Sequence, residues 1–169
     1  MTGMFRDRSS AEAAYNSLLA RGYTKDEIDV IMSDDAKKRH FGNDLDRDGD
    51  TELGNKALEG TGVGSAIGGT LGGIVGAIAA IGTSVALPGL GLIIAGPLAA
   101  GLAGAGAGGL TGGLIGALVG SGIPEERAKV YESGVKEGNI VMGVRPRNEE
   151  DAKYFENDWR TNSGEHIYY

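Results

Sequence analysis

Residues 60–124 read GTGVGSAIGGTLGGIVGAIAAIGTSVALPGLGLIIAGPLAAGLAGAGAGGLTGGLIGALVGSGIP and carry no charged side chain. Within them glycine recurs every fourth residue in two series, which are Gly60, Gly64, Gly68, Gly72 and Gly76, followed by Gly104, Gly108, Gly112, Gly116 and Gly120. On an α-helix this period places each series on one stripe, where the bare backbone lets another helix approach closely. Such grooves are typical of helices packed in membranes. We therefore expect a glycine-zipper helical hairpin, with helices over 62–82 and 97–121 and a link over 83–96.

The length of the two expected helices fits a membrane, whereas their composition leaves a second environment open. At roughly 1.5 Å per residue each helix is about 30 Å long or somewhat longer, which matches the roughly 30 Å hydrocarbon core of a bilayer. Most of their residues are small, so insertion into lipid is only marginally favourable. Two hypotheses follow: a transmembrane hairpin, or a soluble self-assembling protein (a shell, filament or lipid-containing particle) with the hairpins in its oligomeric core. Both predict a homo-oligomer.

The two flanking arms contain all the charged residues and read as mixed α and β structure. A Ser9-Ser10-Ala11-Glu12 capping box predicts a helix that ends at Gly22, and alternating apolar residues predict a strand over 28–33. In the second arm, Pro124 begins a helix that Gly138 ends, and a strand follows over 140–144. Asn148 can cap a last helix, and residues 166–169 suit an edge strand.

Together with a short strand around residues 4–5, the arms give the order β-α-β followed by α-β-α-β. This order predicts an α+β fold, a ferredoxin-like sandwich interrupted by the glycine-zipper α-helical hairpin. Each arm alone has too few strands for a stable sheet, so we expect one discontinuous domain from residues 1–59 and 125–169. Residues 43–59 are its acidic tether to the hairpin at 60–124.

Composition excludes several classes of function. The net charge is −7, and no basic run is longer than Lys37-Lys38-Arg39, which argues against nucleic acid as a partner because phosphate binding needs concentrated positive charge. Without cysteine there is no disulfide, thiolate nucleophile or zinc-thiolate site. The first residues lack the apolar core of a signal peptide, so we expect both arms to stay in the cytoplasm.

The acidic tether contains the best candidate for a metal site. Asp44, Asp46 and Asp48 occupy positions 1, 3 and 5 of an EF-hand-like pattern, glycine occupies position 6, and Asp50 adds a further carboxylate. Asn55 stands at position 12, where the pattern requires a bidentate glutamate. The two interpretations are a calcium site, the only cofactor that the sequence suggests, and a solvated linker.

The sequence offers no convincing catalytic motif, and we expect the protein not to be an enzyme. His40 and His166 are the only side chains suited to act as bases near neutral pH, and neither has a nucleophile close in sequence. The cluster of residues 37–40 is either a solvated face or a contact for anionic lipid headgroups.

Several of these segments resemble bacterial general stress proteins, the heat-induced stress proteins of the YflT type. The resemblance rests on Ile-Met-Ser-Asp-Asp-Ala at residues 31–36, Arg39-His40-Phe41, the glycine zipper, Ile123-Pro124-Glu125-Glu126, and Gly-Asn-Ile-Val-Met-Gly-Val at residues 138–144. It implies a bacterial stress-response protein that associates with membrane or forms a large assembly, and it implies no catalytic residue. We expect it in the bacterial inner membrane with both arms cytoplasmic or, alternatively, in a cytoplasmic assembly, with membrane lipid and itself as partners.

Overall fold

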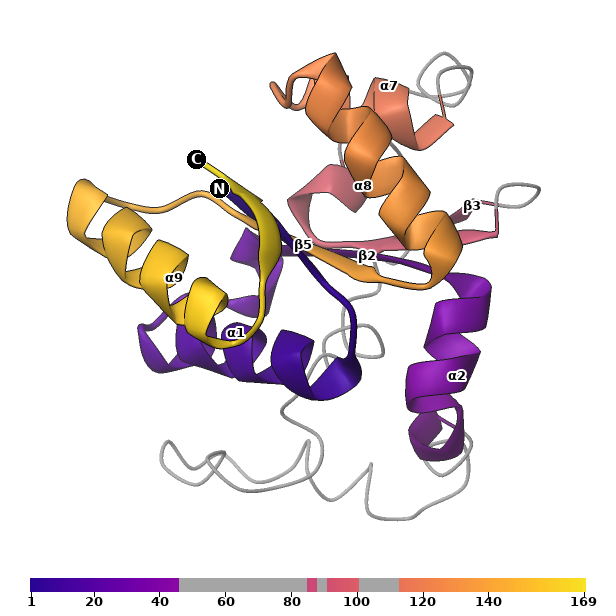
Figure 1. Cartoon of the computed structure of the whole chain (residues 1–169), viewed down its shortest axis with the longest axis horizontal. Helices are drawn as coiled ribbons and strands as arrows, with labels where there is room; N and C mark the ends of the chain where they lie inside the picture. The colour runs from indigo at the N-terminus through magenta and orange to yellow at the C-terminus, as the bar shows by residue number, and fades with distance from the viewer. Residues whose placement is uncertain (46–84, 88–90, 101–112) are drawn as a thin grey trace.

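The protein has an α+β fold built on one six-stranded sheet (Figure 1). A computed structural model describes residues 1–45, 85–87, 91–100 and 113–169. In chain order the elements are β1 (Thr2–Phe5), α1 (Arg8–Ala20), η1 (Lys25–Glu27), β2 (Ile28–Ser33), α2 (Asp34–Leu45), β3 (Val85–Leu87), β4 (Leu92–Ala95), α7 (Gly113–Gly120), α8 (Glu125–Glu137), β5 (Ile140–Val144), α9 (Glu149–Thr161) and β6 (Glu165–Tyr168).

The strands lie in the order β3-β4-β2-β5-β1-β6, and every neighbouring pair is antiparallel. In the centre of the sheet Val30 of β2 is opposite Met142 of β5, and Met4 of β1 is opposite Val141. The two arms that flank the glycine-rich residues therefore share one sheet, as the sequence predicts. β6 forms one edge of the sheet, where the sequence also predicts an edge strand.

Helices cover both faces of the sheet, with α1 and α9 on one side and α7 and α8 on the other (Figure 1). The first face carries a core that includes Phe5, Tyr15 and Trp159, and the second carries a core that includes Ile31 and Tyr131. Because both faces are covered, all five residues of β5 are buried. Such a central strand reads as a continuous apolar run.

The helix ends follow the predicted caps, with one correction. Gly22 and Gly138 have left-handed φ angles of +83° and +99° at the ends of α1 and α8, and the Asn148 side chain accepts a hydrogen bond from the Asp151 amide. The cap of α1, however, is Asp7 and not Ser9: its carboxylate accepts a bond of 2.9 Å from the Ser10 amide. Asp7 has the extended backbone of a cap residue, and the Ser9 hydroxyl donates to the same carboxylate at 2.5 Å.

The structure differs from the expected hairpin in the second half of the uncharged stretch. Residues 83–96, predicted as a link, contain β3 and β4, and Leu92–Ala95 pairs along its whole length with β2. Of the predicted helix over 97–121, residues 97–100 and 113–120 are helical and 101–112 lie outside the described residues; Gly113, at the start of α7, has a left-handed φ of +59°. Buried apolar pairing outweighs the glycine pattern here, so part of the predicted separate hairpin belongs to the α+β domain. The first expected helix, 62–82, lies outside the described residues.

Candidate functional site

Two of the ten zipper glycines are described, and both lie on the exposed side of α7. A Cβ atom built on Gly116 or Gly120 meets nothing within 4 Å, whereas the buried residues Leu114, Ala117 and Leu118 face the second core. α7 is therefore apolar all round but covered on one side only, which is unusual for a surface helix. The other eight zipper glycines lie outside the described residues.

The described helices do not include a span: in those parts of the chain, no helix is both long and apolar enough to cross a bilayer. Most of the predicted calcium ligands lie outside the described residues. These are Asp46, Asp48 and Asp50, whereas Asp44 is placed only as part of the α2 backbone. The described side chains contain no cluster of three or more metal-ligating groups.

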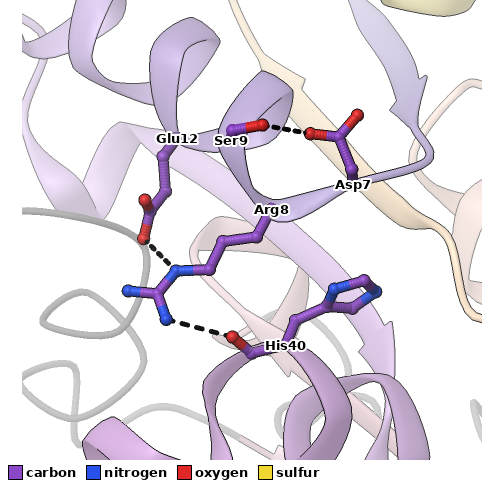
Figure 2. A pocket seen from close by; sticks show the side chains of 5 residues that line it. All are labelled: Asp7, Arg8, Ser9, Glu12 and His40. Carbon is purple, nitrogen blue, oxygen red and sulfur yellow. Dashed lines mark hydrogen bonds and ion pairs between the residues drawn. The ribbon is translucent and has the colours of Figure 1, made fainter.

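The structure brings one of the two histidines, His40, to a surface hollow lined by Asp7, Arg8, Ser9, Glu12 and His40 (Figure 2). Arg8 crosses from α1 to α2, where it donates to the main-chain carbonyl of His40 at 3.0 Å, and it also pairs with Glu12 at 2.9 Å. The Ser9 hydroxyl donates to Asp7 on the other side of the hollow. The polar groups of this hollow thus hold the start of α1 and join it to α2.

The hydrogen-bond partner of the His40 imidazole is a main-chain carbonyl and not Ser9. Its Nε2 atom lies 3.3 Å from the carbonyl oxygen of Gly138, at the end of α8, so the ring can donate to that oxygen. Hydrogen bonds between the side chains drawn in Figure 2 join Ser9 to Asp7 and Arg8 to Glu12, and none joins Ser9 to His40. This geometry does not place His40 as a general base on the Ser9 hydroxyl, whose hydrogen bond goes to the Asp7 carboxylate. His166, on β6, contributes its carbonyl oxygen to the Tyr131 hydroxyl at 2.6 Å.

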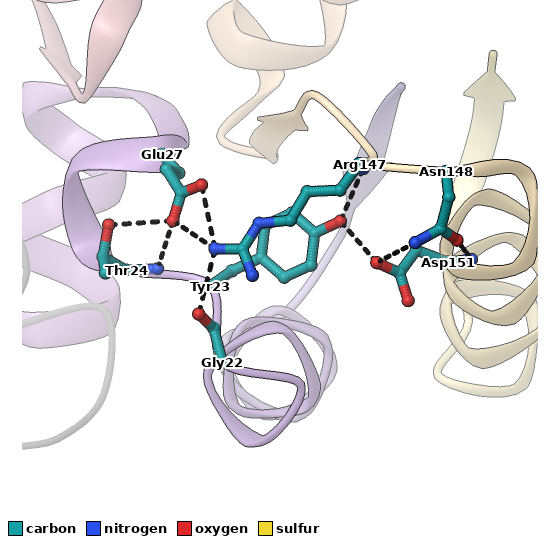
Figure 3. Close-up of polar contacts among 7 residues, drawn as sticks. All are labelled: Gly22, Tyr23, Thr24, Glu27, Arg147, Asn148 and Asp151. Carbon is teal, nitrogen blue, oxygen red and sulfur yellow. Dashed lines mark hydrogen bonds and ion pairs between the residues drawn. The ribbon is translucent and has the colours of Figure 1, made fainter.

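A second polar cluster joins the end of α1 to the start of α9 (Figure 3). The Tyr23 hydroxyl donates to Asp151 at 2.8 Å and accepts from the Arg147 amide at 2.7 Å. The Arg147 guanidinium stacks 4.2 Å from the Tyr23 ring centre and pairs with Glu27 at 2.9 Å. The hydrogen bond from Tyr23 and the charge of Arg21 hold the pKa of Asp151 below its usual value. The donors and acceptors of this cluster satisfy one another, so we interpret it as a structural tie between helices.

The least expected ionisable group is Asp29, in the middle of the sheet. It occupies β2 opposite Gly143 of β5, on the face that also carries Ile31. Its Oδ1 atom accepts a bond of 2.7 Å from the amide of Leu98, in the turn that follows β4. Burial raises its pKa from 3.8 to about 6, and this outweighs the Leu98 hydrogen bond and the positive charges of Arg145 and the Met1 amino group.

Sequence reasoning missed Asp29 because it interpreted the residue as one member of an alternating strand. A carboxylate inside an otherwise apolar strand is an available signal, since buried strands rarely contain aspartate without a partner. The partner itself, a main-chain amide 69 residues away, has no signature in the sequence.

Comparison with known proteins found no match to this chain among family models, curated proteins or solved structures.

Among the described side chains, two buried polar atoms of the first core have no hydrogen-bond partner, namely the Tyr15 hydroxyl and the Trp159 indole nitrogen. We expect Tyr15→Phe to raise the free energy of unfolding by about 1 kcal/mol, because it removes a desolvated hydroxyl without changing the ring. Urea denaturation followed by circular dichroism measures this change. The matched control is Tyr131→Phe, whose hydroxyl bonds Thr2 at 2.9 Å and the His166 carbonyl at 2.6 Å. That control should lower stability, and an equal loss in both variants would contradict the expectation.

Proposed function

We propose that the chain is a non-enzymatic bacterial stress-response protein that associates with the inner membrane through its uncharged glycine-rich segment and oligomerises there. The observation that carries the proposal is the open side of α7. Gly116, Val119 and Gly120 are exposed there, and Val119 keeps 42% of its surface accessible. An apolar helix with a bare backbone stripe gains most from close contact with another helix, and lipid is the environment in which that contact dominates association.

The rest of the fold supports this proposal because elements on both sides of the glycine-rich segment belong to one folded domain. Strands β6, β1, β5 and β2 lie side by side, and α1 and α9 are the helices of two β-α-β units, an arrangement that supports a ferredoxin-like domain. α2 precedes residues 46–84 in the chain, and β3 and β4 follow them. Both ends of the segment are thus attached to one domain, which we propose stays in the cytoplasm.

A soluble self-assembly is the second candidate, and one observation favours it. Leu92, Ile94, Ala99 and Leu114, all from the uncharged stretch, belong to the second core of the domain. This part of the stretch is used to cover the sheet, which leaves a smaller share of it for lipid. In this alternative the open side of α7 packs against other copies inside an oligomeric core.

Substitution on the open side of α7 tests the association common to both candidates. We expect Gly116→Leu combined with Gly120→Leu to weaken self-association at least about tenfold, equivalent to about 1.4 kcal/mol, because leucine side chains fill the groove. The domain should stay folded, since both positions face open space. Analytical ultracentrifugation in detergent and in buffer measures the oligomer.

Ser133→Leu is the matched control, because it adds similar bulk to the exposed side of α8. It should leave the oligomer unchanged. An unchanged oligomer in the double glycine variant would instead overturn the claim that α7 forms the interface. Carbonate extraction of cell membranes then separates the two candidates: a membrane protein stays in the pellet until detergent is added, whereas a regular lipid-free particle that survives detergent indicates the soluble assembly.

A further inference from the structure

The turn after β4 rests directly on Asp29. Gly96 has a φ of +97°, and a Cβ built on it would overlap the carbonyl oxygen of Ile28 and lie 2.8 Å from Asp29 Oδ1. The next turn of chain is helical, with the Ala99 amide bonded to the Gly96 carbonyl at 3.0 Å. Leu98 lies in the first turn of this helical segment, where amides lack a main-chain acceptor, and its amide donates to Asp29 Oδ1.

The same carboxylate is enclosed from the other side by the sheet. Gly143 of β5 lies opposite, and a Cβ there would be 3.2 Å from the Asp29 Cβ and 3.6 Å from the Thr2 side chain. In the described part of the chain, the charges that act on Asp29 are those of Arg145, which follows β5, and the amino group of Met1. The turn itself, Gly96-Pro97-Leu98-Ala99-Ala100, contributes no titratable group. Asp29 thus lies between a covering turn and the sheet, with two positive charges nearby.

We infer that Asp29 and the turn over residues 96–100 form a proton-operated clasp, which closes more tightly on the sheet when the carboxyl group is protonated. The turn follows β4 directly, so the clasp sets how firmly the turn itself is held on the sheet. The clasp acts within one chain. The inference is therefore the same whether the glycine-rich segment contacts lipid or other copies of the chain.

The direction follows from proton linkage. In the closed state the turn covers part of the half-buried Asp29, and this burial holds its pKa at about 6. When the turn lifts, the carboxylate is hydrated and its pKa returns toward 3.8, so the open state binds the proton more weakly. Lowering the pH from about 7.5 to about 5 should therefore decrease the opening equilibrium about tenfold. Acid closes the clasp, and neutral pH loosens it.

Hydrogen exchange of the Leu98 amide measures this equilibrium in the full-length protein. After correction for the intrinsic pH dependence of exchange, its protection factor should be about tenfold higher at pH 5 than at pH 7.5. Asp29→Asn keeps an oxygen acceptor for the amide and removes the titration, so protection should be high at both pH values. Asp26→Asn, an exposed aspartate three residues earlier, should behave as the wild type does.

Two results would overturn the inference. One is a pH-independent protection factor in the wild type, and the other is the same tenfold change in Asp29→Asn. If that variant does not fold, the ¹³C chemical shift of the Asp29 carboxyl group in the wild type decides the question: titration near pH 6 supports the clasp, and titration near pH 4 excludes it.

Discussion

Trp159→Ala should lower the free energy of unfolding by about 3–5 kcal/mol, the largest loss that we expect from any single substitution in this protein. Trp159 is fully buried and meets the Phe5 ring edge-on, with 5.6 Å between ring centres. It also packs on Gly3, where a Cβ would lie 2.8 Å from the indole ring. The side chain thus joins α9 to β1, and its removal leaves a cavity between them that neighbouring side chains can fill only in part.

Urea denaturation followed by circular dichroism is the appropriate measurement, because Trp159 is the only tryptophan and its fluorescence is lost with it. Tyr154→Ala, also on α9, is the matched control, since Tyr154 is 41% exposed and should cost far less. Trp159→Phe should retain much of the stability, because it keeps an aromatic ring and removes an indole nitrogen that has no partner. A loss in Trp159→Ala no larger than in Tyr154→Ala would show that the first core does not depend on this side chain.

The elements after Pro124 could be predicted from the sequence because local signals determine them. Pro124 and Gly138 mark the two ends of α8, and the Asn148 side chain caps α9 as expected. The buried residues of α9, Ala152, Phe155 and Trp159, recur at helical spacing. That both arms share one sheet could be predicted from a count of strands, because neither arm alone has enough for a stable sheet.

β4 could not be predicted, because its evidence lies elsewhere in the chain. Leu92–Ala95 is only four residues long and stands between Gly91 and Gly96, so locally it reads as part of a link rich in helix breakers. It becomes a strand because β2 offers a free edge whose residues it pairs from Val30 to Ser33. The cap of α1 was misplaced for a related reason: Asp7 and Ser9 both suit the position, and only the hydrogen bonds distinguish them.

Among the candidate sites, Asp29 likewise could not be predicted, because its environment is formed by a distant part of the chain. The residue type is visible in the sequence, whereas its burial depends on a turn 67 to 71 residues further along, at 96–100. The glycine stripe stays a prediction from spacing; for the two described members, Gly116 and Gly120, the structure adds that both lie on the open side of α7. Spacing identifies a stripe, but only packing shows whether the stripe is covered.

Gly96→Ala should lower the free energy of unfolding by about 3 kcal/mol, because two costs coincide at this position. A left-handed conformation costs an alanine about 1–2 kcal/mol, and forcing a methyl group into a filled space costs about 1–3 kcal/mol more. The φ of Gly96 is +97°, and its Cβ would overlap the Ile28 carbonyl oxygen, which belongs to the sheet backbone and cannot move aside.

Gly22→Ala separates the two costs in the same denaturation experiment. Gly22 has a similar φ of +83°, but a Cβ there meets nothing within 4 Å. Its replacement should therefore cost only the conformational part, about 1–2 kcal/mol. The difference between the two variants measures the contact of the Gly96 turn with β2, and equal losses would show that no such close contact exists. If the contact is as close as described, Gly96→Ala should also reduce the protection of the Leu98 amide at every pH, because the turn that Asp29 holds can no longer lie flat on the sheet.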